Sequence, residues 1–305
     1  MSVFQKISFT KHCIGLLAAL GISALTVPAM GTEAAEIVSE GPAILYAAEE
    51  SVNMSSGPGD TFQPISSVPY GTPIQVDAMA DNGWYRVSST GGAAWVDGAD
   101  CTVDDPLILT EGCRLIPGTG AGASSATEAK ALFDTIPDPL KPLFSGIDIY
   151  LDRNRLRENY VGNNDVNQLA GIYVYGKEID IDAEYVGSAL LHECGHHIDY
   201  VIGEKYKIGK TFGLYQGVYM LSYTDEFLKI FNLEAQPSGL IAAHPNKEPA
   251  EYFASAFEKY VENPAGLLQC APLTYMYICR LTGDALQFLC SQFFYLPYLQ
   301  CIFSE

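Results

Sequence analysis

Positive charge is scarce in this chain. Only 17 residues are lysine or arginine, against 36 aspartate and glutamate residues, and the formal net charge is −19. Proteins that bind nucleic acid neutralise its phosphates with lysine and arginine, and an excess of negative charge opposes that binding. The composition therefore argues against nucleic acid and other anionic polymers as partners, while it says little about the fold.

Long apolar runs are also few. The run Cys13–Val27 follows Lys6 and Lys11 and precedes small residues, which is the pattern of a secretory signal peptide over residues 1–31. This run is short for a membrane span, although an uncleaved anchor is the alternative. The C-terminal run Ala285–Phe303 contains glutamine, serine and proline, so we expect it to pack on the globular part of the chain. The sequence thus predicts an exported protein without a stable membrane span after signal removal, which lowers the net charge from −19 to −21 because two lysines are lost.

Cysteine pairs with C-x-x-C spacing do not occur, which argues against a separate structural zinc site. Residues 1–31 contain one of the eight cysteines. The odd number that remains requires at least one free thiol or an intermolecular bond. Cys194 is the expected free thiol, as a small core residue. Cys101 and Cys113 are a conceivable bridge, but the sequence does not determine the connectivity.

Histidine is also scarce, with five residues in the chain. His12 lies in the predicted signal peptide, and three of the other four fall within residues 192–197. The stretch L-L-H-E-C-G-H-H-I-D, from Leu190 to Asp199, contains the pattern H-E-x-x-H. On a helix, His192 and His196 lie one turn apart on the same face. A single histidine on a helix is usually an ordinary surface or core residue with its hydrogen bonds satisfied. That explanation does not account for two histidines at this spacing with a glutamate between them.

Two imidazoles so placed can hold one zinc ion, and Glu193 can then act on a neighbouring water as a general base. A catalytic zinc site needs a third protein ligand and leaves a fourth position open. Asp199 is one candidate, although it fits a structural or supporting acid better. His197 is another, but it points about 100° away from its neighbour. Glu251 is the third candidate.

Glu251 lies near the start of a helix that we expect to begin at Pro249, because proline suits the first helical turn. Phe253 and Phe257, four residues apart, would bury one face of that helix. A negative charge at a helix N-terminus is also favoured by the helix dipole, without any metal. The residues alone therefore leave the third ligand open.

The two segments together resemble a known family. H-E-C-G-H-H-I-D at His192–Asp199, followed by E-Y-F-A-S-A-F at Glu251–Phe257, is similar to the catalytic domain of the anthrax lethal factor family, which includes secreted Pro-Pro endopeptidases. Members carry H-E-x-G-H-x-x-D and, on a later helix, E-[FY]-F-A-x-A-F. The likeness covers roughly residues 126–289, including a strand pair at 171–181 and a helix at 225–231.

This resemblance implies a gluzincin-type zincin domain, a mainly helical metallopeptidase fold with a small sheet. The Zn²⁺ ligands would be His192, His196 and Glu251, and Glu193 would be the general base. The substrate would be a protein or peptide, hydrolysed by a water that the metal activates.

One position departs from the family pattern. Seven residues before the ligand glutamate the family has a tyrosine, whose hydroxyl supports the transition-state oxyanion, and this chain has His244 there. An imidazole N–H can aim a hydrogen bond at developing negative charge as a phenol does. We therefore expect His244 to act as a catalytic donor. The alternatives are an idle loop residue, or a weakened or inactive protease that serves as a binding or scaffold protein.

Nearer the N-terminus, short alternating runs separated by turn sequences predict a compact all-β module over residues 41–102. Its segments Val52–Pro58, Gly83–Val87 and Ala94–Val96 resemble a bacterial SH3 domain. Members of that family are small barrels that usually bind peptidoglycan or other peptides through aromatic surface grooves.

Both tryptophans of the chain lie in this module, and with Tyr85 they could line such a groove. Trp84 and Trp95 could equally be core residues of a small barrel, since tryptophan often fills that role. The module is accordingly a candidate for cell-wall or peptide binding.

Residues 103–125 begin with D-D-P and end in a glycine- and serine-rich stretch, which predicts a flexible linker. The sequence therefore predicts an α+β chain in which a signal peptide, the SH3-like barrel, this linker and a metallopeptidase domain over 126–305 follow one another. The expected function is that of a secreted zinc endopeptidase, with the SH3-like module as the candidate for association with the cell wall.

Overall fold

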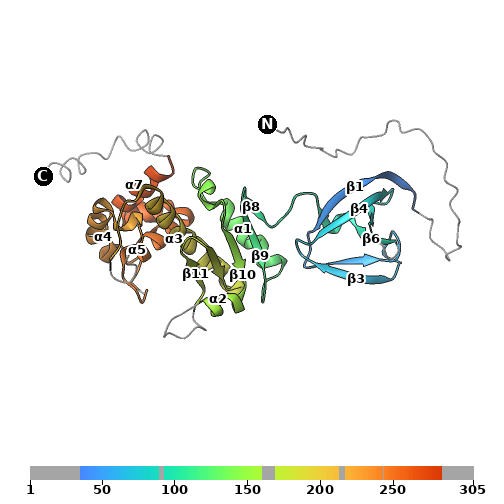
Figure 1. Ribbon diagram of the computed structural model, residues 1–305, viewed down its shortest axis with the longest axis horizontal. Coiled ribbons are helices and arrows are strands. Elements are labelled where there is room, and N and C mark those ends of the chain that lie inside the picture. The colour runs from blue at the N-terminus through green and yellow to red at the C-terminus, as the bar shows by residue number, and fades with distance from the viewer. Residues whose placement is uncertain (1–34, 89–92, 160–168, 213–216, 243, 284–305) are drawn as a thin grey trace. The chain divides into compact units, whose positions relative to one another are not determined.

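The structure, a computed structural model, describes residues 35–88, 93–159, 169–212, 217–242 and 244–283. The predicted signal peptide and the C-terminal apolar run lie outside these residues. The described part contains two β-sheets and a group of helices (Figure 1). None of its helices is both long enough and apolar enough to cross a membrane.

The strands nearest the N-terminus form a seven-stranded sheet in the order β3-β2-β6-β5-β4-β1-β7. They are Ile37–Ala47 (β1), Ser51–Ser55 (β2), Pro64–Pro69 (β3), Pro73–Ala80 (β4), Trp84–Val87 (β5), Ala94–Asp97 (β6) and Cys101–Thr102 (β7). The predicted all-β module is confirmed, but β3 and β7 are the two edges of an open sheet, not neighbours in a closed barrel. Strand β7 pairs with β1 through two residues only, and so short a strand offers few hydrogen bonds for closure.

The interior of this sheet follows the two-residue period of its strands. On β4, Ile74 and Val76 are buried and alternate with exposed residues. Trp84 and Trp95 are each only 8% exposed, and Tyr85 is half-buried against the cluster that contains Ile74 and Val76. The two tryptophans are therefore buried, which favours the core alternative over an exposed aromatic groove.

A second, five-stranded sheet has the order β11-β12-β10-β9-β8. Its strands are Ile108–Thr110 (β8), Cys113–Pro117 (β9), Asp148–Leu151 (β10), Gly171–Val174 (β11) and Glu178–Ile181 (β12). Strand β10 runs parallel to both β9 and β12, whereas β11 is antiparallel to β12. The strand pair expected at 171–181 is thus confirmed.

Strands β8 and β9 lie within residues 103–125, for which we predicted a flexible linker. That prediction is wrong for residues 108–117, because Cys113 and Leu115 are fully buried and β9 pairs with β10. The alternating apolar residues of this stretch are few, and the aspartate, proline and glycine residues on either side of them gave the impression of a linker. The sheet beneath the helices therefore includes residues before 126.

The helices are Ala123–Asp134 (α1), Arg153–Asn159 (α2), Val186–Tyr206 (α3), Asp225–Ser238 (α4), Pro249–Glu262 (α5), Pro264–Cys270 (α6) and Pro272–Leu281 (α7). Short 3-10 helices at Gly98–Asp100, Lys141–Phe144, Ala183–Tyr185 and Leu221–Tyr223 connect several elements. The mainly helical character expected of this domain and the helix expected to begin at Pro249 are confirmed in the described residues. One core joins Phe133 of α1, Leu190 of α3 and Phe253 of α5 to the sheet.

The five-stranded sheet presents chemically different faces. Ile179 and Ile181 of β12 belong to the core that also contains Leu190 of α3. Glu178 and Asp180 alternate with these isoleucines and therefore point to the opposite face, where α2 lies.

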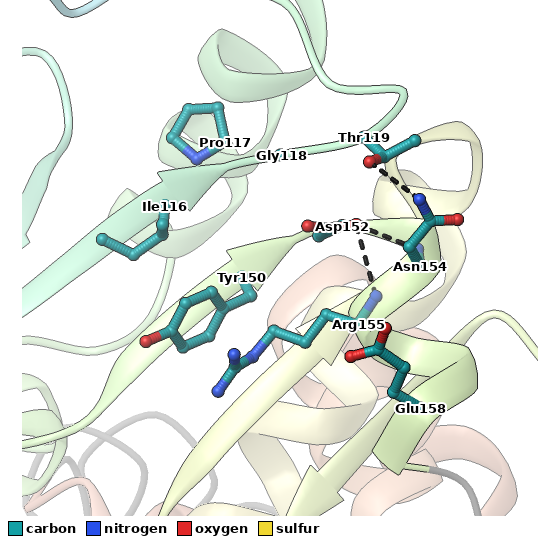
Figure 2. A pocket seen from close by; sticks show the side chains of 9 residues that line it. All are labelled: Ile116, Pro117, Gly118, Thr119, Tyr150, Asp152, Asn154, Arg155 and Glu158. Atoms are coloured by element: carbon teal, nitrogen blue, oxygen red, sulfur yellow. Dashed lines mark hydrogen bonds between the residues drawn. The ribbon is translucent and has the colours of Figure 1, made fainter.

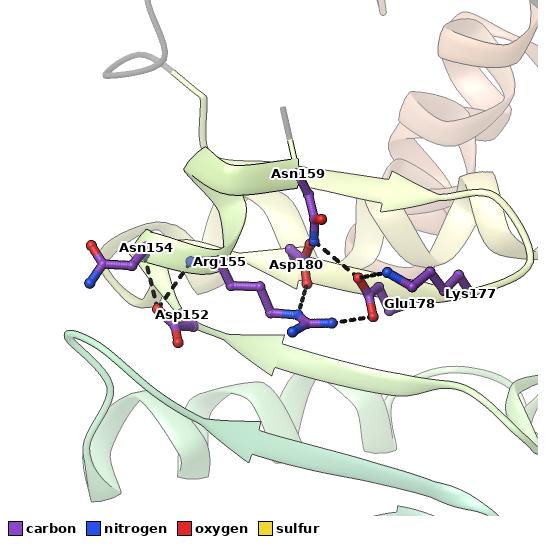
Figure 3. Close-up of polar contacts among 7 residues, drawn as sticks. All are labelled: Asp152, Asn154, Arg155, Asn159, Lys177, Glu178 and Asp180. Atoms are coloured by element: carbon purple, nitrogen blue, oxygen red, sulfur yellow. Dashed lines mark hydrogen bonds and ion pairs between the residues drawn. The ribbon is translucent and has the colours of Figure 1, made fainter. Parts of the chain in front are cut away.

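A buried ion-pair network fastens α2 to that face (Figure 3). The Arg155 Nε lies 3.2 Å from Asp180 Oδ1, and the same guanidinium bonds Glu178. The Asn159 amide donates to Glu178 at 3.0 Å and to Asp180 at 2.6 Å. Both carboxylates are buried. Buried carboxylates are stable only when paired and hydrogen-bonded, as these are.

A pocket of about 310 Å³ opens beside this network, between β9, β10 and α2 (Figure 2). The Asp152 carboxylate in its wall accepts hydrogen bonds from the backbone N–H groups of Asn154 and Arg155. The Asn154 amide donates to the Thr119 hydroxyl at 3.1 Å. These polar groups thus hold the start of α2, and the pocket contains no residue of the H-E-x-x-H motif.

We expect Arg155→Met to destabilise the protein by about 3–5 kcal/mol, because it leaves the buried Asp180 carboxylate without its cation, while Glu178 keeps Lys177 at 2.9 Å. The free energy of unfolding from denaturant titration measures this effect. Lys229→Met, at an exposed position on α4, removes the same charge and should change the free energy by less than about 0.5 kcal/mol. Equal losses in the two variants would contradict the role of the network.

Candidate metal centre

Helix α3 carries the H-E-x-x-H residues and is held by burial on most of its surface. Leu190, Leu191, Cys194 and Ile198 all pack into the core, and the helix ends at Lys207 in a left-handed backbone conformation. Cys194 is a buried free thiol, as expected, and no disulfide occurs among the cysteines in the described residues.

Gly195 allows α3 and α5 to approach closely. A Cβ at this position would lie 2.8 Å from the Ala254 Cα and 3.1 Å from its carbonyl oxygen. Those are backbone atoms, so the contact could be relieved only by moving one helix. The glycine of the H-E-x-G-H pattern therefore sets the distance between the two helices that carry the site.

That close approach brings Glu251 against both histidines. The Glu251 Oε2 lies 3.4 Å from His192 Nε2 and 3.2 Å from His196 Nε2. In a tetrahedral site with bonds of about 2.0–2.1 Å, two donor atoms stand about 3.3 Å apart. The two measured distances fit that spacing. The donor atoms of His192, His196 and Glu251 lie within 4.8 Å of one another. Within the described residues, these three side chains form the group that could hold one metal ion.

The charges of this group are mutually stabilised. Burial lowers the pKa of His192, but the carboxylates of Glu251 and Glu258 outweigh it and raise the pKa to about 10. Burial raises the pKa of Glu251, yet hydrogen bonds from His192 and His196 bring it well below its usual range. The Glu251 carboxylate is therefore ionised.

Glu193 lies beside this group, buried on α3. Burial raises its pKa, while the neighbouring histidines and a hydrogen bond from the Tyr173 backbone N–H lower it, and the net shift is upward. A carboxylate with a raised pKa next to a metal site is suited to accept a proton and pass it on.

His244 also reaches this group, from the segment before α5. Its Nε2 lies 3.3 Å from Glu251 Oε2, and its ring lies 5.9 Å from the His192 ring at an angle of 22°. Its Nδ1 lies 2.7 Å from the Asn246 carbonyl oxygen, to which it can donate, and 3.2 Å from the Asn246 backbone N–H, from which it can accept. When it accepts, the proton of the neutral ring is on Nε2. His244 is not a member of the compact donor group. It is thus close enough to act on a bound substrate without lying among those donors.

The other two candidates for the third ligand point elsewhere. His197 is buried, with Nε2 2.9 Å from the Leu143 carbonyl oxygen and Nδ1 3.3 Å from the Tyr173 hydroxyl. Burial lowers its pKa to about 4, so it is neutral. Asp199 accepts hydrogen bonds from the backbone N–H and hydroxyl of Ser222, at 2.7 and 2.6 Å. Both residues support α3 from the side away from Glu251.

Two residues near the site were not anticipated from the sequence. Ser255 and Glu258 of α5 both face His192 Nδ1. Their positions, four and seven residues after Glu251, place them on the same side of the helix, and that spacing was the signal available in the sequence.

Two family models match the chain. Residues 148–281 match "Anthrax toxin lethal factor, N- and C-terminal domain", and residues 50–101 match "Bacterial SH3 domain". Both resemblances inferred from the sequence are thereby confirmed, and the first match spans all the residues of the candidate centre.

No curated protein sequence shows a significant match to the chain. Among solved structures, the Pro-Pro endopeptidase PPEP-2 from Paenibacillus alvei is similar, with 22% sequence identity and a TM-score of 0.39. The match covers 55% of this chain and 96% of that chain. A likeness of this degree carries no conclusion about activity.

We expect Gly195→Ala to destabilise the protein by about 1–3 kcal/mol and to weaken metal binding, because the added methyl group forces α3 away from α5. Denaturant unfolding and zinc titration measure the two effects. Gly187→Ala is the matched control on the same helix, where the added carbon meets only the end of the Glu128 side chain. If both variants behave alike, Gly195 does not set the helix spacing.

Proposed function

We propose that this protein is a secreted zinc-dependent endopeptidase. The observation that carries the proposal is the convergence of His192, His196 and Glu251, whose two nitrogen–oxygen distances match a tetrahedral metal site, with Glu193 beside them. Two nitrogen donors and one carboxylate oxygen form a donor set of the kind found in catalytic zinc sites, which keep a fourth position for water or substrate. The match to the lethal factor family model supports the same reading.

In the proposed mechanism, His192, His196 and Glu251 would hold a zinc ion, which would serve as a Lewis acid for a neighbouring water and a peptide carbonyl. Glu193 accepts the proton of the attacking water and delivers it to the leaving amine. Its raised pKa favours the first of these transfers, because it makes the carboxylate a stronger base. A His244 N–H is proposed to donate to the oxyanion that forms on the former carbonyl.

Export and wall association form the second part of the proposal. The charged and apolar pattern of residues 1–31 supports secretion. The match of residues 50–101 to the bacterial SH3 family supports binding to peptidoglycan or a peptide. Since Trp84 and Trp95 are interior residues, such binding would use other side chains of the module.

The second candidate function is that of a protease-like binding or scaffold protein with little or no activity. The replacement of the family tyrosine by His244 is the observation that favours it. Zinc content and cleavage of a peptide library, with and without a chelator, distinguish the two functions. The endopeptidase binds one zinc ion per chain and loses cleavage with the chelator, whereas the scaffold cleaves no peptide under either condition.

We expect Glu193→Gln to retain zinc but to lower turnover by about 10²–10⁴-fold, because the general base is gone. His192→Ala and His196→Ala should lose the metal. His197→Ala is the matched histidine control and should keep it, since its ring nitrogens bond Leu143 and Tyr173 instead. Zinc analysis of the purified variants, together with peptide cleavage rates, measures these effects. Zinc loss in His197→Ala would contradict the assignment of the donor group.

We expect His244→Ala to keep its zinc and to lower kcat by about 10²–10³-fold, as loss of an oxyanion donor does. His244→Tyr, which restores the phenol of the family pattern, should recover much of that rate. Steady-state cleavage of a fluorogenic peptide measures both. Unchanged kcat in His244→Ala would show that His244 is idle.

A further inference from the structure

The two histidines of the donor group differ in the surroundings of their second ring nitrogen. Both present Nε2 to Glu251, so a bound metal leaves the proton of each neutral ring on Nδ1. The Nδ1 of His196 is buried and has no hydrogen-bond partner within the described part of the chain. The Nδ1 of His192 has the Ser255 hydroxyl at 3.5 Å and the Glu258 carboxylate at 3.8 Å.

Helix α5 therefore contacts His192 from two directions. Glu251, Ser255 and Glu258 follow one another at spacings of four and three residues, which places them along one face of the helix. Glu251 faces Nε2 of the ring, and the other two side chains face Nδ1. A single helix thus fixes both the position and the orientation of this imidazole.

From this arrangement we propose that Glu258 is a positioning residue for His192, with Ser255 as the nearer contact. The inference rests on the proposed function, because it presumes that His192 binds a metal. A carboxylate beside Nδ1–H keeps the proton on that nitrogen and makes Nε2 a better electron donor. The 3.8 Å separation is longer than a hydrogen bond, so Glu258 acts through its charge while the Ser255 hydroxyl can make the short contact.

The partial burial of the pair strengthens this effect. The side chains of His192 and Glu258 are 14% and 26% exposed. Charges that are screened only in part by water interact more strongly than a fully exposed pair. Asp199, three residues after His196, accepts hydrogen bonds from Ser222. Among the described residues, Glu258 is accordingly the acidic side chain that faces Nδ1 of His192, the ring nitrogen that does not face Glu251.

The test compares the zinc affinity of the full chain with that of Glu258→Gln, by competition with a chromophoric chelator. We expect the affinity to fall about 10–100-fold, as it does when the partner of a ligating histidine is removed. The unfolding temperature of the metal-free variant should match that of the metal-free parent. Glu262→Gln is the matched control, with the same charge change at an exposed position on the same helix, and should leave the affinity unchanged.

A second variant separates positioning from general structural damage. Ser255→Asp added to Glu258→Gln returns a carboxylate to the face of α5 that meets Nδ1, and should restore most of the lost affinity. A parent protein that binds zinc while Glu258→Gln binds it equally well would overturn this inference alone. A parent that binds no zinc would overturn the proposed function, and the inference with it.

Discussion

The close packing of α3 against α5 is the constraint on which the candidate centre depends. The absence of a side chain at Gly195 lets the two helices approach until Ala254 touches the α3 backbone. At that separation the Glu251 carboxylate reaches two imidazoles that are one helical turn apart. No loop has to be placed accurately for these three donors to meet, because each is fixed by a helix whose buried face belongs to the common core. The site is thus a consequence of how two amphipathic helices fill that core.

The rest of the domain supports α3 on its other sides. The isoleucines of β12 pack beneath it, His197 bonds the Leu143 carbonyl, and Asp199 receives Ser222. These contacts use polar residues of the motif segment itself, which explains how so many ionisable side chains can lie in one buried helix. On the far face of the sheet, Arg155 pairs with the buried carboxylates of Glu178 and Asp180, and Lys177 also pairs with Glu178. Such local pairing lets this acidic chain bury carboxylates although it has few positive charges overall.

The sequence predicted those features whose signal is local. The H-E-x-x-H spacing placed His192 and His196 on one helix face, and Pro249 marked the start of the helix that carries Glu251. Selecting Glu251 over Asp199 and His197 required the family resemblance, because a pairing across 55 residues leaves no local pattern. Strands β8 and β9 were not predicted, because β9 is buried through its pairing with β10, which lies far away in the sequence. The open edge of the seven-stranded sheet and the burial of Trp84 and Trp95 likewise depend on pairings that a single strand does not encode. Glu258 was overlooked because only the packing of α5 against α3 shows what it faces.

The central claim is that one cation binds between α3 and α5 through two imidazoles and one carboxylate. A crystal structure of the zinc-loaded protein, with anomalous data collected at the zinc absorption edge, tests it most directly. The account predicts a single strong anomalous peak about 2.0–2.2 Å from His192 Nε2, His196 Nε2 and a Glu251 carboxylate oxygen, with a non-protein fourth ligand. A peak elsewhere in the molecule, or one at this position whose fourth ligand is a side chain such as His244, would contradict it.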